Sequence, residues 1–145
     1  MTKDLSAFFA ANVEEPEVVE VTISKRFKNK DGNPELFEFK AISNDTDNAI
    51  RKMCIRKKLI TQGPKKGQHE QEFDALKYQT LLTIESMVHP NLRDVELQKQ
   101  HGVMGEEDLF NKLFLPAEIA DAYRAAEKAN GYEKDMSELV EDVKN

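Results

Sequence analysis

The chain has 145 residues, of which 39% are hydrophobic and 33% charged, and its formal net charge is −6. This length predicts one domain, or one domain with a flexible arm, and the lack of an apolar run of about 20 residues excludes a membrane-spanning helix. One cysteine and three scattered histidines argue against a disulfide, a metal site and a cofactor, and the weakly basic N-terminus lacks the pattern of a signal peptide, so we expect a soluble cytoplasmic protein.

Residues 1–16 are predicted to form an N-terminal hydrophobic arm. Its apolar residues have helical spacing: Leu5, Phe8, Phe9 and Val13. A helix of about two turns is marginal alone and needs a docking surface, and Pro16 ends it. The arm either folds on a partner or packs on its own domain. We take Phe8 and Phe9 as candidate partner-binding residues.

Residues 17–42 alternate as expected for a β-hairpin. The first strand carries apolar residues at every second position: Val19, Val21 and Ile23. The turn signal Asp31-Gly32 follows, and a second alternating run extends over residues 36–42. One hairpin is rarely stable by itself, so a third strand, helices or another chain must complete it.

A helix is expected over about residues 45–59, and it completes the segment 17–62. Several N-cap candidates precede it in residues 43–47. Cys54 lies on its apolar face and is expected to be a small buried residue, since no histidine is near enough in the sequence to favour a nucleophile. A flexible break then follows at residues 63–67.

From residue 69 onward the chain is predicted to be wholly helical. Four helices and a short acidic terminal helix are expected, at residues 70–88, 92–101, 106–114, 116–130 and 135–143. The fold class is therefore α+β: an N-terminal β-hairpin or small antiparallel sheet followed by a mainly helical C-terminal region. We expect the helical region 69–145 to form one compact domain with residues 17–62.

The last two helices are expected to face in different directions. In the first of them, three residues are predicted to pack inward: Ile119, Tyr123 and Ala126. The acidic terminal helix carries the more exposed apolar set, which adds three candidate partner-binding residues: Leu139, Val140 and Val143.

Charge is unevenly distributed along the chain. Residues 25–68 carry twelve lysines and arginines against five acidic residues, whereas both flanking segments are acidic. This basic middle could bind nucleic acid, bind an acidic partner, or be neutralised by the chain's own acidic ends. The negative net charge and the lack of interleaved aromatic residues argue against nucleic acid.

No catalytic signature is recognisable in the sequence. The segment from His69 to Phe73 begins like a zinc-protease helix, but Phe73 stands where the second histidine is needed. No serine, threonine or cysteine lies in a known nucleophile motif. We therefore expect a protein that is not an enzyme. An enzyme of unrecognised type stays open, because catalytic residues can be far apart in sequence.

Several segments carry capping and packing patterns whose combination is distinctive. They are the run Leu115-Pro116-Ala117-Glu118-Ile119, the turn Asn130-Gly131-Tyr132, the run His89-Pro90-Asn91-Leu92 and the final residues 138–145. With the order of the predicted elements, they resemble the XkdN-like tail assembly chaperones of long-tailed bacteriophages and related prophages. The resemblance covers about residues 4–145.

The resemblance implies a non-enzymatic role in viral tail assembly. A protein of this kind would bind and solubilise the tape measure protein and help to recruit tail tube subunits. Its partners would be the tape measure protein, with the tail tube protein and a second copy of the chain as further candidates. It would act in the host bacterial cytoplasm and be absent from the mature virion. The alternative is a nucleic-acid-binding phage accessory protein that uses the basic middle.

Overall fold

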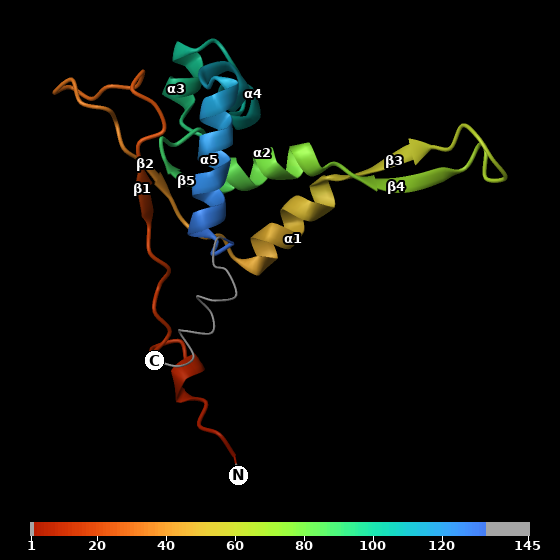
Figure 1. Ribbon diagram of the computed structural model, residues 1–145, viewed down its shortest axis with the longest axis horizontal. Helices are drawn as coiled ribbons and strands as arrows, with labels where there is room; N and C mark the ends of the chain where they lie inside the picture. Colours follow the sequence, from red (N-terminus) through yellow and green to blue (C-terminus); the bar gives the residue numbers. More distant parts are fainter. Residues whose placement is uncertain (1, 133–145) are drawn as a thin grey trace.

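The computed structural model describes residues 2–132, which form small sheets and five α-helices (Figure 1). Its strands are β1 (Val19–Val21), β2 (Phe37–Phe39), β3 (Ile55–Leu59), β4 (His69–Phe73) and β5 (Met87–His89). Its helices are the 3-10 turn η1 (Ser6–Phe8), α1 (Asn44–Met53), α2 (Ala75–Ser86), α3 (Val95–Gln100), α4 (Glu106–Leu113) and α5 (Pro116–Ala129). The predicted α+β class is confirmed.

The predicted N-terminal hairpin is confirmed as the pair β1–β2. The two strands are antiparallel, with Val19 opposite Phe39 and Val21 opposite Phe37. β5 pairs with the other edge of β2 and supplies the third strand that an isolated hairpin needs. Phe37 and Phe39 point into the core, so the sheet buries one face.

The helix expected over residues 45–59 is too long, because the chain leaves the helix after Met53. Residues 55–59 form β3 instead, which pairs with β4 in a second hairpin. In that pairing Arg56 lies opposite Glu72 and Lys58 opposite Glu70. Opposite charges across a strand pair are favourable. Pairing with β4 therefore determines that residues 55–59 form a strand, although these residues are also compatible with a helix.

The expectation that the chain is wholly helical from residue 69 onward is also wrong in two places. β4 occupies the start of the helix predicted over residues 70–88, so α2 begins only at Ala75, after the N-cap Asp74. Oδ1 of Asp74 accepts a hydrogen bond of 3.1 Å from the Lys77 amide. At the other end, residues 87–89 pair with β2 as β5. The three later helices lie within the ranges predicted for them.

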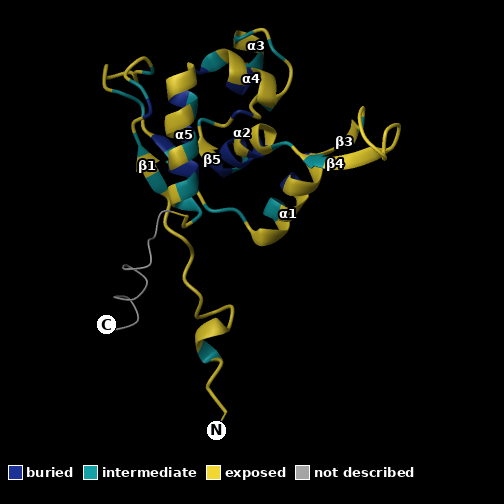
Figure 2. Cartoon of the chain, turned by 45° about the vertical axis from the view of Figure 1, so that its right-hand side comes forward, coloured by how far each residue is buried: buried dark blue, intermediate teal, exposed yellow. Residues whose placement is uncertain are grey.

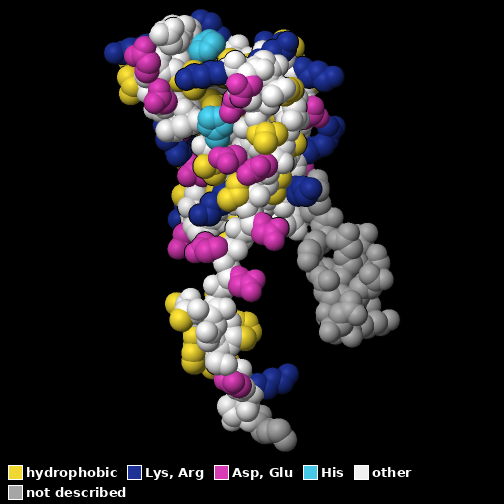
Figure 3. All heavy atoms as spheres, turned by 90° about the vertical axis from the view of Figure 1, so that its left-hand side faces the viewer, with side chains coloured by type: hydrophobic (Ala, Val, Ile, Leu, Met, Phe, Trp, Pro, Cys, Tyr) yellow, Lys and Arg dark blue, Asp and Glu magenta, His cyan; other side chains and the backbone are white. Residues whose placement is uncertain are grey.

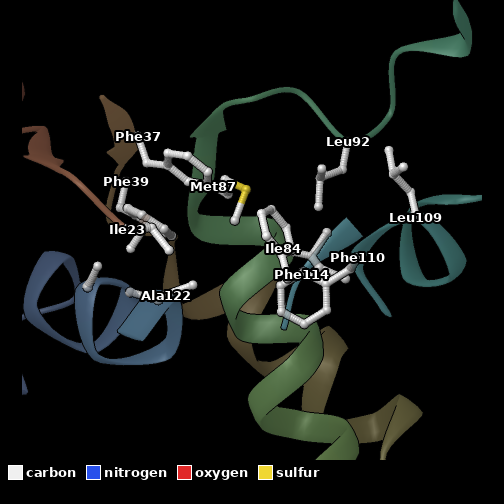
Figure 4. Packing of buried hydrophobic residues seen from close by; sticks show 12 residues of the cluster. Ile23, Phe37, Phe39, Ile84, Met87, Leu92, Leu109, Phe110, Phe114 and Ala122 are labelled. Atoms are coloured by element: carbon white, nitrogen blue, oxygen red, sulfur yellow. The ribbon is translucent and has the colours of Figure 1, made fainter. Parts of the chain in front are cut away.

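α2 is the central element of the fold, because it lies between two hydrophobic clusters. On one side, Ile84 and Met87 pack in a cluster with residues of the sheet, α4 and α5. Phe110 and Phe114 belong to the same cluster (Figure 4). The other side of α2 packs on α1. The buried residues of this second cluster are Ile50, Cys54, Tyr78, Leu81 and Leu82. Buried residues are concentrated on these central elements, whereas the N-terminal arm and the β3–β4 hairpin are almost wholly exposed (Figure 2).

The N-terminal end of α5 is fixed by a buried carboxylate. Glu118 accepts two hydrogen bonds from the Arg26 guanidinium, of 2.9 and 2.6 Å, and one of 2.8 Å from the Leu115 amide. Arg26 also donates to the Leu113 carbonyl at 3.1 Å. A forked arginine in the β1–β2 connection thus joins the end of α4 to the start of α5.

The C-terminal end of α5 is fixed by Asn130. Its side-chain oxygen accepts a hydrogen bond of 2.9 Å from the Ile42 amide, and its side-chain nitrogen donates to the Ser86 hydroxyl at 2.9 Å. One residue therefore joins α5 to the segment before α1 and to the end of α2. Gly131 follows with φ +84°, the left-handed conformation that the sequence predicts for it.

The Arg26–Glu118 pair should make stability depend on pH. The Arg26 guanidinium is the main reason why the pKa of Glu118 is about 2, against an ordinary value of 4.5, although burial opposes this shift. A carboxyl with a lowered pKa stabilises the fold above its ordinary pKa, and this contribution is lost as the pH falls toward 2. We expect Glu118→Gln to lower the free energy of unfolding at pH 7 by about 2–3 kcal/mol.

Urea denaturation at pH 7, 4 and 3 measures this effect. The difference between the wild type and Glu118→Gln should shrink as the pH falls, and Glu107→Gln, an exposed first-turn residue of α4, is the matched control. A difference that is the same at all three pH values would contradict the assignment.

Candidate functional site

A groove lies between α2 and α5. It has a volume of about 360 Å³. Residues spaced three and four apart on α2 form one wall: Leu76, Gln79, Thr80 and Thr83. The other wall has the same spacing on α5: Pro116, Ile119, Ala120, Tyr123, Arg124 and Glu127. Such spacing places each set on one helix face, so the groove follows from the contact between the two helices.

The groove has an apolar centre and a polar rim. Leu76 is 74% exposed although it is a large apolar residue of the lining. Ile119 and Tyr123 are partly buried and form the centre, and burial raises the pKa of the Tyr123 hydroxyl. On the rim, Arg124 forms an ion pair of 2.7 Å with Asp121. An apolar centre with a polar rim is the usual composition of a protein-binding surface.

The inward packing predicted for α5 is confirmed, with a qualification for two residues. Ala126 is fully buried in the main cluster. Ile119 packs against this cluster and Tyr123 against the α1–α2 cluster, but both also line the groove. Cys54 is buried as expected, and burial raises the pKa of its thiol, which disfavours the reactive thiolate.

The N-terminal arm contains a shorter helix than predicted, and it lies apart from the body of the protein. The helix expected over residues 5–13 is reduced to the turn η1, at whose start Asp4 accepts hydrogen bonds from the Ser6 amide and hydroxyl. Phe8 and Phe9 are 77% and 58% exposed. The apolar side chains of the arm stand away from the body in Figure 3. Of the other candidate residues, Leu139, Val140 and Val143 lie outside the described part of the chain.

The basic middle does not come together as one surface. The β1–β2 connection, with Lys25, Lys28 and Lys30, lies on the opposite side of the body from the β3–β4 hairpin (Figure 1). Three of the arginines are neutralised within the fold: Arg26 by Glu118, Arg51 by Asp47 at 2.8 Å, and Arg56 by Glu72 at 3.5 Å. Neutralisation by the chain's own acids therefore accounts for part of the charge pattern.

A second, smaller pocket lies beside the three-stranded sheet. It has a volume of about 200 Å³ and an almost wholly apolar lining, which includes Phe27, Phe37, Pro90, Leu97 and Leu113. His89 is on its edge, with Nε2 3.3 Å from a Glu35 oxygen. The sequence analysis identified neither hollow, since both combine residues from distant elements.

Residues 2–132 contain neither a candidate metal-ion site nor a membrane-spanning helix. Within this range, no three or more histidine, cysteine, aspartate or glutamate side chains are grouped so as to hold a metal ion. No helix in the same range is long and apolar enough to cross a membrane.

Comparison with known proteins gives a consistent result. A family profile described as phage XkdN-like tail assembly chaperone protein matches residues 5–144. The chain is 31% identical to the uncharacterized protein YqbN of Bacillus subtilis (strain 168), over 98% of this chain and 93% of YqbN. It is 28% identical to the phage-like element PBSX protein XkdN of the same organism, over 98% of this chain and 94% of XkdN. The fold is similar to the crystal structure of YqbN, with a TM-score of 0.75 and 27% identity, over 92% of this chain and all of that one.

Substitution of the arm residues tests whether Phe8 and Phe9 act outside the body of the protein. The double substitution Phe8→Ser and Phe9→Ser should change the melting temperature by no more than about 3 °C, because exposed residues contribute little to stability. Association of the chain with another protein or with a second copy should weaken, as sedimentation or pull-down would measure. Met104→Ser, another exposed apolar substitution, is the control. A large fall in melting temperature with unchanged association would place both rings in the core.

Proposed function

Because this chain belongs to the phage XkdN-like tail assembly chaperone family, we propose that it binds an amphipathic helical segment of the phage tape measure protein. Binding keeps that protein soluble until the tail forms around it. The α2–α5 groove is the observation that supports this proposal, since it offers a ready site for one further helix.

The groove suits a helix because its two walls are themselves helical. A third helix can lay its side chains into the space between two packed helices, as helix-in-groove complexes do. The ligand would cover Leu76, which is the most exposed apolar residue of the lining, and would contact Ile119 and Tyr123. Tyrosine is a frequent energetic centre of such interfaces, since it offers a large apolar ring and a polar end.

The charge of the chain also suits a chaperone. An exposed apolar groove favours aggregation, and a net charge of −6 opposes it by repulsion between copies. The rim residues Gln79, Arg124 and Glu127 separate the apolar centre from the surrounding surface. The groove can therefore remain accessible to a ligand.

The wider role proposed here has four parts. The protein acts by binding, without catalysis. It works in the host bacterial cytoplasm and leaves before the virion is mature. The exposed arm, with Phe8 and Phe9, is the candidate contact for tail tube subunits or for a second copy of the chain. Residues 17–62 and 69–145 act together as one compact domain, because both contribute to the clusters around α2.

A substitution in the groove tests the binding site. Leu76→Asp places a charge in the apolar groove and should reduce the affinity for a tape measure helix at least about tenfold. The fold should be unaffected, since the side chain is exposed. Val95→Asp is the matched control, because Val95 is 63% exposed on α3 and does not line the groove. Isothermal calorimetry with the cognate tape measure segment gives the affinity.

Two further readouts separate this function from nucleic-acid binding. Binding of an apolar helix should give a negative heat-capacity change and depend weakly on salt. Binding to nucleic acid through the lysines of the β3–β4 hairpin would fall steeply with salt. If the tape measure protein aggregates equally with and without this chain, and no complex survives gel filtration, the chaperone proposal fails.

A further inference from the structure

We propose that the chain's own C-terminal segment, residues 133–145, docks in the α2–α5 groove in the free protein. The docked segment would then occupy the site of the tape measure helix, the client proposed above. This consequence of docking rests on the proposed function. Three observations support this occupant: the point where the segment begins, its length, and its pattern of apolar and acidic residues.

The segment begins at the end of the groove. After α5, the Gly131 amide donates to the Lys128 carbonyl at 3.1 Å and the Tyr132 amide to the Glu127 carbonyl at 3.0 Å. These two bonds form a Schellman motif, which turns the chain away from the helix axis. Tyr132 then lines a small pocket with Tyr123 and Glu127, and these two residues also line the groove. The described part of the chain therefore ends beside two residues of the groove, on the side that faces α1.

The length of the segment matches the length of the groove. The helix expected over residues 135–143 would span about 14 Å, and residues 133–134 are left for the reversal of the chain. On α5 the groove runs from Glu127 back to Pro116, which is about 17 Å at the helical rise of 1.5 Å per residue. A segment that returns antiparallel to α5 can therefore cover most of the groove.

The residues of the segment match the groove in kind. Its apolar residues have the spacing of one helix face: Met136, Leu139, Val140 and Val143. This stripe would cover the exposed apolar patch formed by Leu76 and the residues beside it. The segment carries five acidic residues against two lysines, whereas the groove rim carries Arg124, which is paired with Asp121, and Glu127, so the match of the two surfaces is chiefly apolar.

Docking within one molecule would regulate access to the groove. A tethered ligand has an effective concentration on the order of millimolar, so even weak contacts are enough to occupy the site much of the time. A client helix must then displace the segment. Its apparent affinity is its intrinsic affinity multiplied by the fraction of time that the groove is free. Leu139, Val140 and Val143 would thus serve an internal partner first and become available to other proteins when a client binds.

Photocrosslinking of the full chain tests the docking without any client. With a benzophenone amino acid at position 143, we expect a crosslink within one molecule to residues of the α2–α5 groove, mapped by mass spectrometry. Leu76→Asp should reduce its yield at least threefold, whereas Val95→Asp should not change it. A crosslink to another surface such as the β3–β4 hairpin, a crosslink between molecules that vanishes on dilution, or an equal yield in Leu76→Asp would overturn the inference.

Client affinity separates this inference from the proposed function. In the full chain, Leu139→Ser with Val143→Ser should raise the affinity for the tape measure helix about threefold or more, and Glu138→Gln with Ser137→Ala is the matched control on the same segment. An intramolecular crosslink without any client binding would leave the docking intact and reject the proposed client. Client binding that Leu76→Asp weakens, without any intramolecular crosslink, would support the proposed function and reject the docking.

Discussion

The bond between Arg26 and Glu118 determines where α5 lies, and most of the functional surface depends on that position. Glu118 is buried, and a buried carboxylate is costly unless it is paired with a cation and hydrogen-bonded. The Arg26 fork and the Leu115 amide together donate three hydrogen bonds to it. Because Arg26 also donates to the last turn of α4, the start of α5 cannot shift without breaking several charged hydrogen bonds. The groove beside α2 therefore has a defined width.

The sequence predicted those elements whose signals are local. α5 begins at Pro116 and ends before Gly131, as its own capping residues indicate, and α4 follows its own apolar spacing. The strands β3, β4 and β5 were missed because their partners are distant in the chain: Arg56 is paired with Glu72, and Met87 with Phe39. A short segment such as residues 55–59 is compatible with either structure, and pairing decides between them.

The family, confirmed by the match over residues 5–144, was recognised from caps and turns of the C-terminal half and not from any site. The arm residues Phe8 and Phe9 were identified because apolar residues in a short isolated segment have nothing local to pack on. The groove was not identified, since Leu76 and Ile119 each look like part of an ordinary core stripe. Only the crossing of α2 and α5 leaves one edge of each stripe uncovered. Glu118 was expected in a first helical turn, but nothing in the sequence connected it to Arg26, 92 residues earlier.

The β3–β4 hairpin departs from the body and returns to it at a single point. The Asp74 amide donates to the Cys54 carbonyl at 2.7 Å, so α1 and α2 are joined directly beneath the hairpin. None of its strand residues is buried. Insertions, deletions and sequence drift in residues 55–73 would therefore leave the junction of the two helices intact. The length and sequence of this extension can therefore differ between related phage proteins while the body that holds the groove stays the same.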